Sequence, residues 1–368
     1  MKRIKSIDIF RGLGMVYIMV GHMIDWWSQS SDNWLFYVYV SLFSALGAAG
    51  FVFISGVSTM ISYRNRLEKA RNSLEYNMKI IKKEYYIRAF LILGLALVYN
   101  FIVVIQFFDI TIIWKWFIIL TVAGCLLLAW PVLRTSKLAR ILIGLLIWGI
   151  NQFLLHILLP FEAQGNFPGI IFYIFYNSKD QNPILSFFTF FLIGTVLGDV
   201  IYDFSLIEDD SERKKVFKEK IAIPLLLIGL LLIAVGIPFL YPDLFSVRIL
   251  TININFWWQI YTIGLDLIII LVILSLEVYG FFTTKKSYRF LFYFSYYSLS
   301  LFLLQNINFI LFYDLLNRYN IWFFILVTII LYGIFLRFMY MKLERKFSLK
   351  VQIGKLSVSL ALKNKKCE

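Results

Sequence analysis

The sequence predicts an all-α integral membrane protein with about ten transmembrane helices and with both termini in the cytoplasm. Of its 368 residues, 60% are hydrophobic and 19% are aromatic, and the mean hydropathy is +0.78. Soluble domains contain about 45–50% apolar residues, so this composition is typical of a polytopic membrane protein. Lipid cannot satisfy the backbone of an open strand, so we expect every span to be helical.

The spans follow from apolar stretches of about 20 residues, the length that crosses a bilayer core roughly 30 Å thick. Between them we expect two charged loops, 63–84 and 203–220, to form amphipathic surface helices, and two nearly uncharged loops, 28–41 and 159–183, to lie outside. The predicted spans are 8–27, 42–62, 85–106, 112–131, 138–158, 184–202, 221–241, 257–279, 291–312 and 321–341.

The distribution of basic residues tests this count. With the N-terminus inside, 32 of the 36 Lys and Arg residues fall in inner segments, and the other four are Lys115, Lys179, Arg248 and Arg318. Cytoplasmic loops are enriched in Lys and Arg, so ten helices with both ends inside fit the sequence. The net charge of +14 is explained by the same asymmetry, and we predict no nucleic-acid partner.

The chain is predicted to form one transmembrane domain over 1–345, followed by a basic cytoplasmic tail over 346–368. The basic start "MKRIKSIDIF" lacks a small-residue cleavage site and is interpreted as part of a retained first span. Cys125 and Cys367 provide neither a disulfide framework nor metal-ligand spacing, so no metal site is predicted. We expect a multi-pass protein of the cell membrane, surrounded by lipid.

The first span, "SIDIFRGLGMVYIMVGHMIDWW" (6–27), carries Asp8, Arg11, His22 and Asp25. At 100° per residue these four side chains share one stripe about 100° wide, with Arg11 and His22 roughly 16 Å apart along the axis. Ionisable residues within a membrane helix cost roughly 2.5–3.5 kcal/mol each, so this stripe should face the bundle. Such a helix links an inner cation to an outer imidazole.

Structural interpretations of the same residues also remain open. Asp8 is suited to capping the start of the helix, with Arg11 as its ion-pair partner. The structural alternative for His22 is a buried hydrogen-bond donor, and that for Asp25 is a solvated helix end.

These residues resemble the opening of the heparan-alpha-glucosaminide N-acetyltransferase family and its prokaryotic relatives. That family belongs to a superfamily of multi-pass transmembrane acyltransferases with an Arg-Gly motif and a histidine eleven residues later, as in Arg11 and His22. Five segments carry the resemblance in chain order: "SIDIFRGLGMVYIMVGH" (6–22), "GAAGFVFISGVSTMISYRNR" (47–66), "YIRAFLILGLAL" (86–97), "FFTFFLIGTVLGDVIY" (187–202) and "FSYYSLSLFLLQ" (294–305).

The resemblance implies transfer of an acetyl group from cytosolic acetyl-CoA to a glycan or glycolipid across the membrane. It implies that His22 is the catalytic histidine, and that Arg11 and Arg88 bind the nucleotide and pyrophosphate of CoA. By analogy with the animal relatives it also implies a homodimer. The donor-site residues that it indicates are Asp8, Arg11, Ser55, Gly56, Arg88 and Gln305.

Acetyl transfer requires a base for the acceptor and a donor to the oxyanion. His22 suits the first task, Asp25 is placed to orient its ring, and Asn33 or a backbone amide suits the second. Covalent and direct transfer both remain open. Two positions depart from the family: Gln305 stands where many relatives have histidine, and the animal enzymes have asparagine at the site of His22 and histidine in the following loop, near Asn33.

Two other functions compete with the enzyme. A glycolipid or small-solute transporter would use the polar stripe as a pathway, although the sequence shows neither a duplicated half nor paired broken helices. A non-catalytic protein with an acyltransferase fold would explain Gln305. Loss of acetyl transfer in His22→Ala would favour the enzyme over both.

Overall fold

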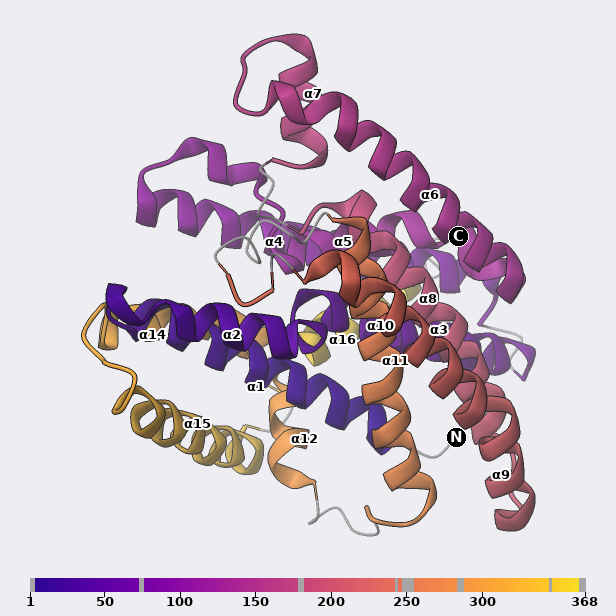
Figure 1. Ribbon diagram of the computed structural model, residues 1–368. Coiled ribbons are helices and arrows are strands. Elements are labelled where there is room, and N and C mark those ends of the chain that lie inside the picture. Colours follow the sequence, from indigo (N-terminus) through magenta and orange to yellow (C-terminus); the bar gives the residue numbers. More distant parts are fainter. Residues whose placement is uncertain are drawn as a thin grey trace.

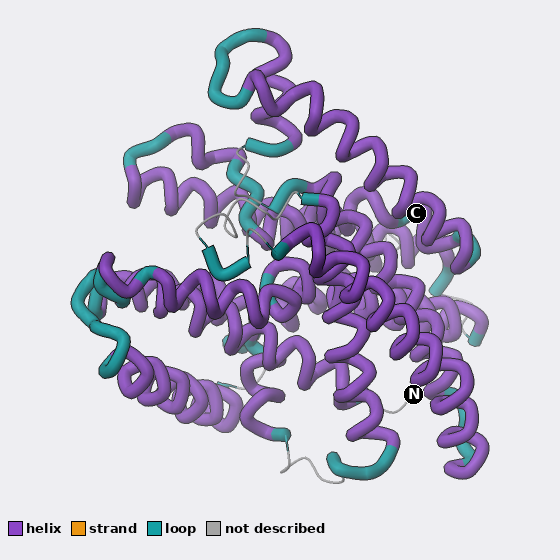
Figure 2. The backbone as a smooth tube through the Cα atoms, in the orientation of Figure 1, coloured by secondary structure: helices purple, strands orange, loops and turns teal. Residues whose placement is uncertain are grey.

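A computed structural model describes residues 4–72, 76–177, 182–241, 244–246, 255–282, 288–343 and 346–363. The regular secondary structure in these ranges is helical, and the one pairing of extended backbone that they contain is an isolated bridge between Ser28 and Leu316. Figure 2 shows the helices joined by short loops. Three residues singled out in the sequence, Lys179, Arg248 and Cys367, lie outside the described ranges.

The α-helices are α1 (Lys5–Trp27), α2 (Trp34–Phe43), α3 (Ala48–Arg71), α4 (Met78–Phe107), α5 (Ile118–Ala129), α6 (Lys137–Leu158), α7 (Phe167–Phe175), α8 (Ile184–Ser205), α9 (Asp210–Val216), α10 (Ile223–Leu240), α11 (Phe256–Val278), α12 (Arg289–Tyr296), α13 (Ser298–Leu304), α14 (Asn308–Leu311), α15 (Ile321–Lys342) and α16 (Leu349–Lys363). Shorter turns of 3-10 or π type are η1 (Ser30–Asp32), η2 (Ser44–Leu46), η3 (Ile110–Trp114), η4 (Val132–Arg134), η5 (Leu159–Phe161), η6 (Phe217–Ala222) and η8 (Gln305–Ile307).

Nine helical segments of the described chain are long and apolar enough to cross a membrane. They coincide with nine of the ten predicted spans, so the prediction of an all-α, multi-pass membrane protein is confirmed. The tenth, 291–312, is broken into α12, α13, η8 and α14, and the prediction of a single helix there is wrong. Serine, asparagine and glutamine side chains interrupt this segment, and such side chains compete with the backbone for helical hydrogen bonds.

The second predicted span differs in a similar way. Residues expected as the loop 28–41 include α2, and the chain turns at Gly47 (φ −76°, ψ −138°) before α3 begins. The described residues of the charged segment 63–84 form no separate surface helix. Instead α3 continues to Arg71 and α4 begins at Met78, where the side chain of Asn77 accepts a hydrogen bond from the amide of Ile80 (3.1 Å).

Two further charged segments form helices. The predicted surface helix within 203–220 is confirmed as α9, which continues through η6 into α10. In the segment predicted as a basic tail, 346–368, most of the described residues form α16, which packs against α4 and α13. The C-terminal segment is therefore part of the bundle.

The helices divide into a largely buried and a largely exposed group, and Figure 1 shows two of the exposed ones, α6 and α15, at the edges of the bundle. In the most apolar stretches of α1, α2–α3, α8 and α11, between 61% and 78% of residues are buried. In α4, α6, α10 and α15 this share is between 17% and 28%, and their exposed side chains are mostly large and apolar. Lipid contact accounts for an apolar exposed face, so we assign the exposed faces of the second group to lipid.

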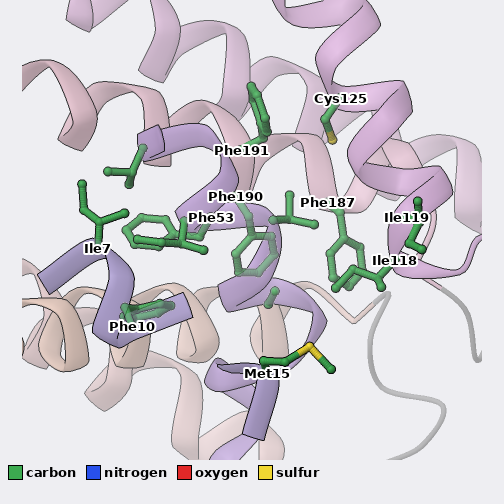
Figure 3. Packing of buried hydrophobic residues seen from close by; sticks show 14 of the residues in the cluster. Ile7, Phe10, Met15, Phe53, Ile118, Ile119, Cys125, Phe187, Phe190 and Phe191 are labelled. Atoms are coloured by element: carbon green, nitrogen blue, oxygen red, sulfur yellow. The ribbon is translucent and has the colours of Figure 1, made fainter. Parts of the chain in front are cut away.

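The centre of the bundle depends on close packing of α3 against α8. Cβ atoms added at Gly56 and Gly194 would each lie 2.1 Å from a backbone carbonyl of the other helix, that of Phe191 and that of Phe53. Small residues allow such approach between membrane helices. Figure 3 shows Phe53 and Phe191 within the buried cluster around this contact.

The broken segment α12–α14 packs against α1, with contacts from each of its three helices. Near the start of α1, the carbonyl of Leu291 lies against Gly12. Near its end, the indole of Trp27 donates a hydrogen bond to the carbonyl of Asn308 (2.6 Å). These contacts place the irregular backbone of α12–α14 along the side of the first helix that carries Gly12 and Trp27.

Candidate functional site

The start of α1 is held by its neighbours. The amides of Lys5 and Ser6 donate hydrogen bonds to the carboxylate of Glu277 in α11 (3.0 and 2.7 Å). Asp8 is buried and accepts a hydrogen bond from the hydroxyl of Ser295 (3.2 Å). Glu277 thus caps these first amides, a role that the sequence had suggested for Asp8.

Arg11 lies one turn further along α1, where two cavities meet. Its guanidinium donates a hydrogen bond to the hydroxyl of Ser58 in α3. Arg11 and Ser58 line a narrow cavity of about 120 Å³ and also a wide cavity of about 560 Å³. These two residues therefore form the boundary between the cavities.

The narrow cavity lies among α1, α3, α4, α5, α13 and α16. One part of its wall is apolar, and the other part carries cations and hydroxyl groups. Its lining residues are Arg11, Phe51, Ser55, Ser58, Thr59, Arg88, Ile92, Ile119, Val122, Leu126, Ser298, Leu299 and Lys350.

Three cations, Arg11, Arg88 and Lys350, share this small volume. In the described parts of the chain no carboxylate forms an ion pair with Arg88. The charges of Arg66 and Arg11 disfavour the charged form of Arg88, and that of Glu84 favours it. A cation held among like charges inside a membrane bundle is costly and indicates a functional site, here one that fits an anion.

The wide cavity is more polar and more open. It is lined by Ile4, Ile7, Asp8, Arg11, Ser58, Ile61, Ser62, Asn65, Arg66 and Lys69. Arg66 pairs with the buried Glu84 (2.7 Å), which also accepts a hydrogen bond from the hydroxyl of Tyr76 (2.5 Å). Burial and this hydrogen bond raise the pKa of Tyr76 above its ordinary value, so the hydroxyl stays protonated and continues to donate to Glu84.

His22 occupies a different environment near the other end of α1. Its ring is half-buried and stacks on Trp26, with centroids 4.8 Å apart. Over the described ranges neither ring nitrogen has a hydrogen-bond partner, and Asp25 is exposed without a contact to it. Asn33 is also exposed, in the turn that follows. The structure thus leaves the imidazole without the orienting contact that the sequence suggested for Asp25.

The residues predicted for the site therefore fall into two groups. Asp8, Arg11, Ser55 and Arg88 line the two cavities, whereas His22 does not line either of them. Along the stripe between Arg11 and His22 lies Met15, which is fully buried.

A comparison with protein families now adds to this geometry. The family model for the heparan-alpha-glucosaminide N-acetyltransferase catalytic domain matches residues 3–235, which is more than half of the chain. The chain belongs to this family. Comparisons with curated proteins and with solved structures gave no match.

Membership in the heparan-alpha-glucosaminide N-acetyltransferase family implies a membrane-embedded acetyltransferase with acetyl-CoA as its donor. The matched range contains Arg11, His22 and Arg88 and ends before Gln305 and Lys350. The family match therefore covers the cavity walls contributed by α1, α3, α4 and α5, and not the wall contributed by α13 and α16.

Two of the predicted residues lie away from the cavity lining of this family member. Gly56 faces α8, where it allows close contact with Phe191. Gln305 is buried in η8, and neither its side-chain oxygen nor its nitrogen has a hydrogen-bond partner in the described chain. Buried polar groups are nearly always satisfied, so this pair of atoms indicates either function or an ordered water.

Several site residues were not singled out from the sequence. Lys350 and Ser298 come from segments read as tail and as uninterrupted helix, and Thr59, Ser62 and Lys69 lie on α3 among many similar side chains. For α3 the sequence did contain a pattern that indicates these residues. Hydroxyl side chains recur there at helical spacing and lie on one face of the helix, namely those of Ser55, Ser58, Thr59 and Ser62.

A second charged cluster, around Asp199 in α8, has a structural role. Arg140 is buried, pairs with Asp199 and donates a hydrogen bond to the carbonyl of Thr195 (3.0 Å). Arg64 bridges Asp199 (3.1 Å) and Asp203 (2.8 Å), and Lys137 also pairs with Asp203 (3.0 Å). These cations have carboxylate partners within the protein, unlike Arg88.

Proposed function

We propose that this protein is a transmembrane acetyltransferase that takes its acetyl group from cytosolic acetyl-CoA. The acceptor is an amine or hydroxyl of a glycan or glycolipid on the opposite side of the membrane. The observation that carries this proposal is Arg88, a cation without a carboxylate partner in the described chain, which lines the same narrow cavity as Arg11. Family membership supplies the reaction class, and the cavity supports a donor site.

The chemistry of acetyl-CoA fits the two cavities. The 3′-phosphate of CoA requires cations, which Arg66 and Lys69 contribute on the wide side, and its diphosphate fits the cations of the narrow cavity, Arg11 and Arg88 among them. Its less polar pantetheine arm fits the apolar wall of the narrow cavity, where Ile92 and Leu126 lie. Arg11 then lies where the arm leaves the phosphates.

The charge distribution supports a cytosolic donor. Both cavities lie near the N-terminal end of α1, together with the segments that contain most of the 36 Lys and Arg residues. Basic segments stay on the cytoplasmic side, and that side is where acetyl-CoA is available to the family.

His22 is proposed as the base near the opposite surface. The bond between the acceptor nitrogen or oxygen and the acetyl carbonyl carbon forms while the carbon–sulfur bond breaks. His22 takes the proton of the acceptor, the electron pair of the broken bond leaves on the CoA sulfur, and the imidazolium then returns the proton to this thiolate. Asn33 is proposed as a donor to the oxyanion and Asp25 as an orienting group when the acceptor is bound.

This proposal requires the acetyl group to travel beyond the narrow cavity. Met15 lies between Arg11 and His22 on the stripe of α1 and is fully buried. A methionine side chain has three rotatable bonds and adapts easily to a changed environment. We therefore propose that movement of Met15 connects the donor cavity to the imidazole.

Sealed proteoliposomes test the proposed direction. Labelled acetyl-CoA is added outside vesicles that contain glucosamine, and insertion orientation is determined by protease cleavage of the C-terminal segment. We expect labelled N-acetylglucosamine inside those vesicles in which the protein exposes its C-terminus. No transfer in either orientation would contradict the proposal, and movement of a glycolipid without any dependence on acetyl-CoA would support a transporter.

A further inference from the structure

One wall of the narrow cavity comes from a helix beyond the part of the chain matched by the family. Lys350, in the first turn of α16, lines this cavity together with Arg11 and Arg88. We propose that Lys350 is a donor-binding residue that contacts the diphosphate of CoA. This inference rests on the proposed function and adds the C-terminal helix to the donor site.

The start of α16 is fixed against the corner between α12 and α13. The hydroxyl of Ser300 donates to the carbonyl of Phe347 (2.9 Å) and accepts from the amide of Leu349 (3.1 Å). The hydroxyl of Ser348, which is fully buried, donates to the carbonyl of Tyr296 (2.9 Å). These bonds determine where the first turn of α16 lies, and so where Lys350 enters the cavity wall.

The ammonium group of Lys350 is also positioned directly. It donates a hydrogen bond to the carbonyl of Ser295 (3.0 Å), and the hydroxyl of Ser295 donates to Asp8 (3.2 Å). Ser295 therefore connects Lys350 to the beginning of α1, one turn before Arg11. The carboxylate of Asp8 lines the wide cavity and is absent from the lining of the narrow one.

The three cations together identify the chemistry of the ligand. Lys350, Arg11 and Arg88 come from three different helices and converge on a cavity of about 120 Å³. The hydroxyls of Ser55, Ser58, Thr59 and Ser298 line the same space. Several converging cations and hydroxyl donors match a group with more than one negative charge, and a diphosphate is such a group.

A purely structural role for Lys350 is the competing explanation, because its bond to Ser295 also joins α16 to α12. The two roles differ in their dependence on the ligand. A diphosphate contact affects CoA and leaves unchanged the binding of pantetheine, which lacks the phosphates. A structural role affects both ligands equally, or neither. Glutamine at position 350 keeps a hydrogen-bond donor for Ser295 and removes the charge.

The experiment measures the affinities of CoA and pantetheine for the full-length protein in lipid nanodiscs by titration calorimetry. Lys350→Gln should weaken CoA binding about 10- to 100-fold, the range expected for a lost charge-assisted hydrogen bond, and leave pantetheine binding unchanged. Lys350→Arg should keep most of the CoA affinity. The matched control is Lys355→Gln, an exposed lysine of the same helix, which should change neither affinity.

The outcomes separate this inference from the proposed function. Wild-type protein that binds CoA while Lys350→Gln binds it equally well would overturn the role of Lys350 and leave the donor site intact. Equal weakening of CoA and pantetheine would also overturn it and favour the structural explanation. If wild-type protein binds no CoA, the proposed function and this inference both fail.

Discussion

Arg11 of α1 donates a hydrogen bond to the hydroxyl of Ser58 in α3, at the junction between the narrow and the wide cavity. The hydroxyl of Ser58 in turn donates to the carbonyl of Ile54 in the preceding turn (2.7 Å), so its lone pairs are directed to Arg11. This contact fixes the guanidinium where a ligand that extends from one cavity into the other must pass it. The predictions that follow test this arrangement.

Replacement of Arg88 by glutamine should separate binding from stability. We expect CoA affinity to fall about 10- to 100-fold, because a charge-assisted contact to phosphate is lost. We expect the ligand-free protein to be at least as stable as wild type, because Arg88 has no carboxylate partner in the described chain. Titration calorimetry and thermal unfolding measure these two quantities. Unchanged CoA affinity, or a marked loss of stability, would contradict the role assigned to Arg88.

Arg140 provides the matched comparison, because it is a buried arginine with a partner. Arg140→Gln should lower the free energy of unfolding by about 3 kcal/mol, since Asp199 loses one of its two cations inside the protein. The ratio of CoA affinity to pantetheine affinity should stay at its wild-type value. Detergent-induced unfolding and calorimetry test this pair of expectations. A selective loss of CoA binding would show that the cluster around Asp199 belongs to the donor site.

The α3–α8 contact predicts a strong dependence on glycine. Gly194→Ala places a Cβ atom 2.1 Å from the carbonyl oxygen of Phe53, so the helices must separate, at a cost of about 1–3 kcal/mol in unfolding free energy. Gly94→Ala on α4 meets no atom within 4 Å and should be neutral or stabilising by up to about 1 kcal/mol. Thermal unfolding of both variants decides the matter. Equal stability of the two would mean that α3 and α8 are not closely packed.

Much of the fold could be predicted because the membrane restricts it. Apolar length fixed the positions of nine spans, and the lipid environment required them to be helical. The breaks at Gly47 and within 291–312 were not predicted. Hydropathy averaged over about 20 residues shows that a segment is apolar, but it does not show where the helical hydrogen bonds are interrupted. These breaks also remove one argument against a transporter, namely the apparent lack of interrupted helices, so the family match carries more of the functional conclusion.

The candidate site was predictable only where it lies on one helix. The 3.6-residue period placed Arg11 on the inward face of α1, and the resemblance added Arg88 and Ser55. Lys350 could not be found in this way. Its position depends on hydrogen bonds that join the start of α16 to Ser300 and Tyr296, about 50 residues earlier in the sequence. The position of the His22 imidazole outside the two cavities could not be predicted for a related reason. Helical geometry gives the direction of a side chain and says nothing about the space around it.

The most direct test of the account is acetyl transfer by His22→Ala, measured with labelled acetyl-CoA and glucosamine. The chain has only two histidines, so His156→Ala, at an exposed position near the end of α6, is the natural control. The account predicts that His22→Ala lowers transfer by about 10²- to 10⁴-fold with CoA affinity unchanged, and that His156→Ala transfers at the wild-type rate. Wild-type transfer by folded His22→Ala protein would contradict the catalytic role of this imidazole.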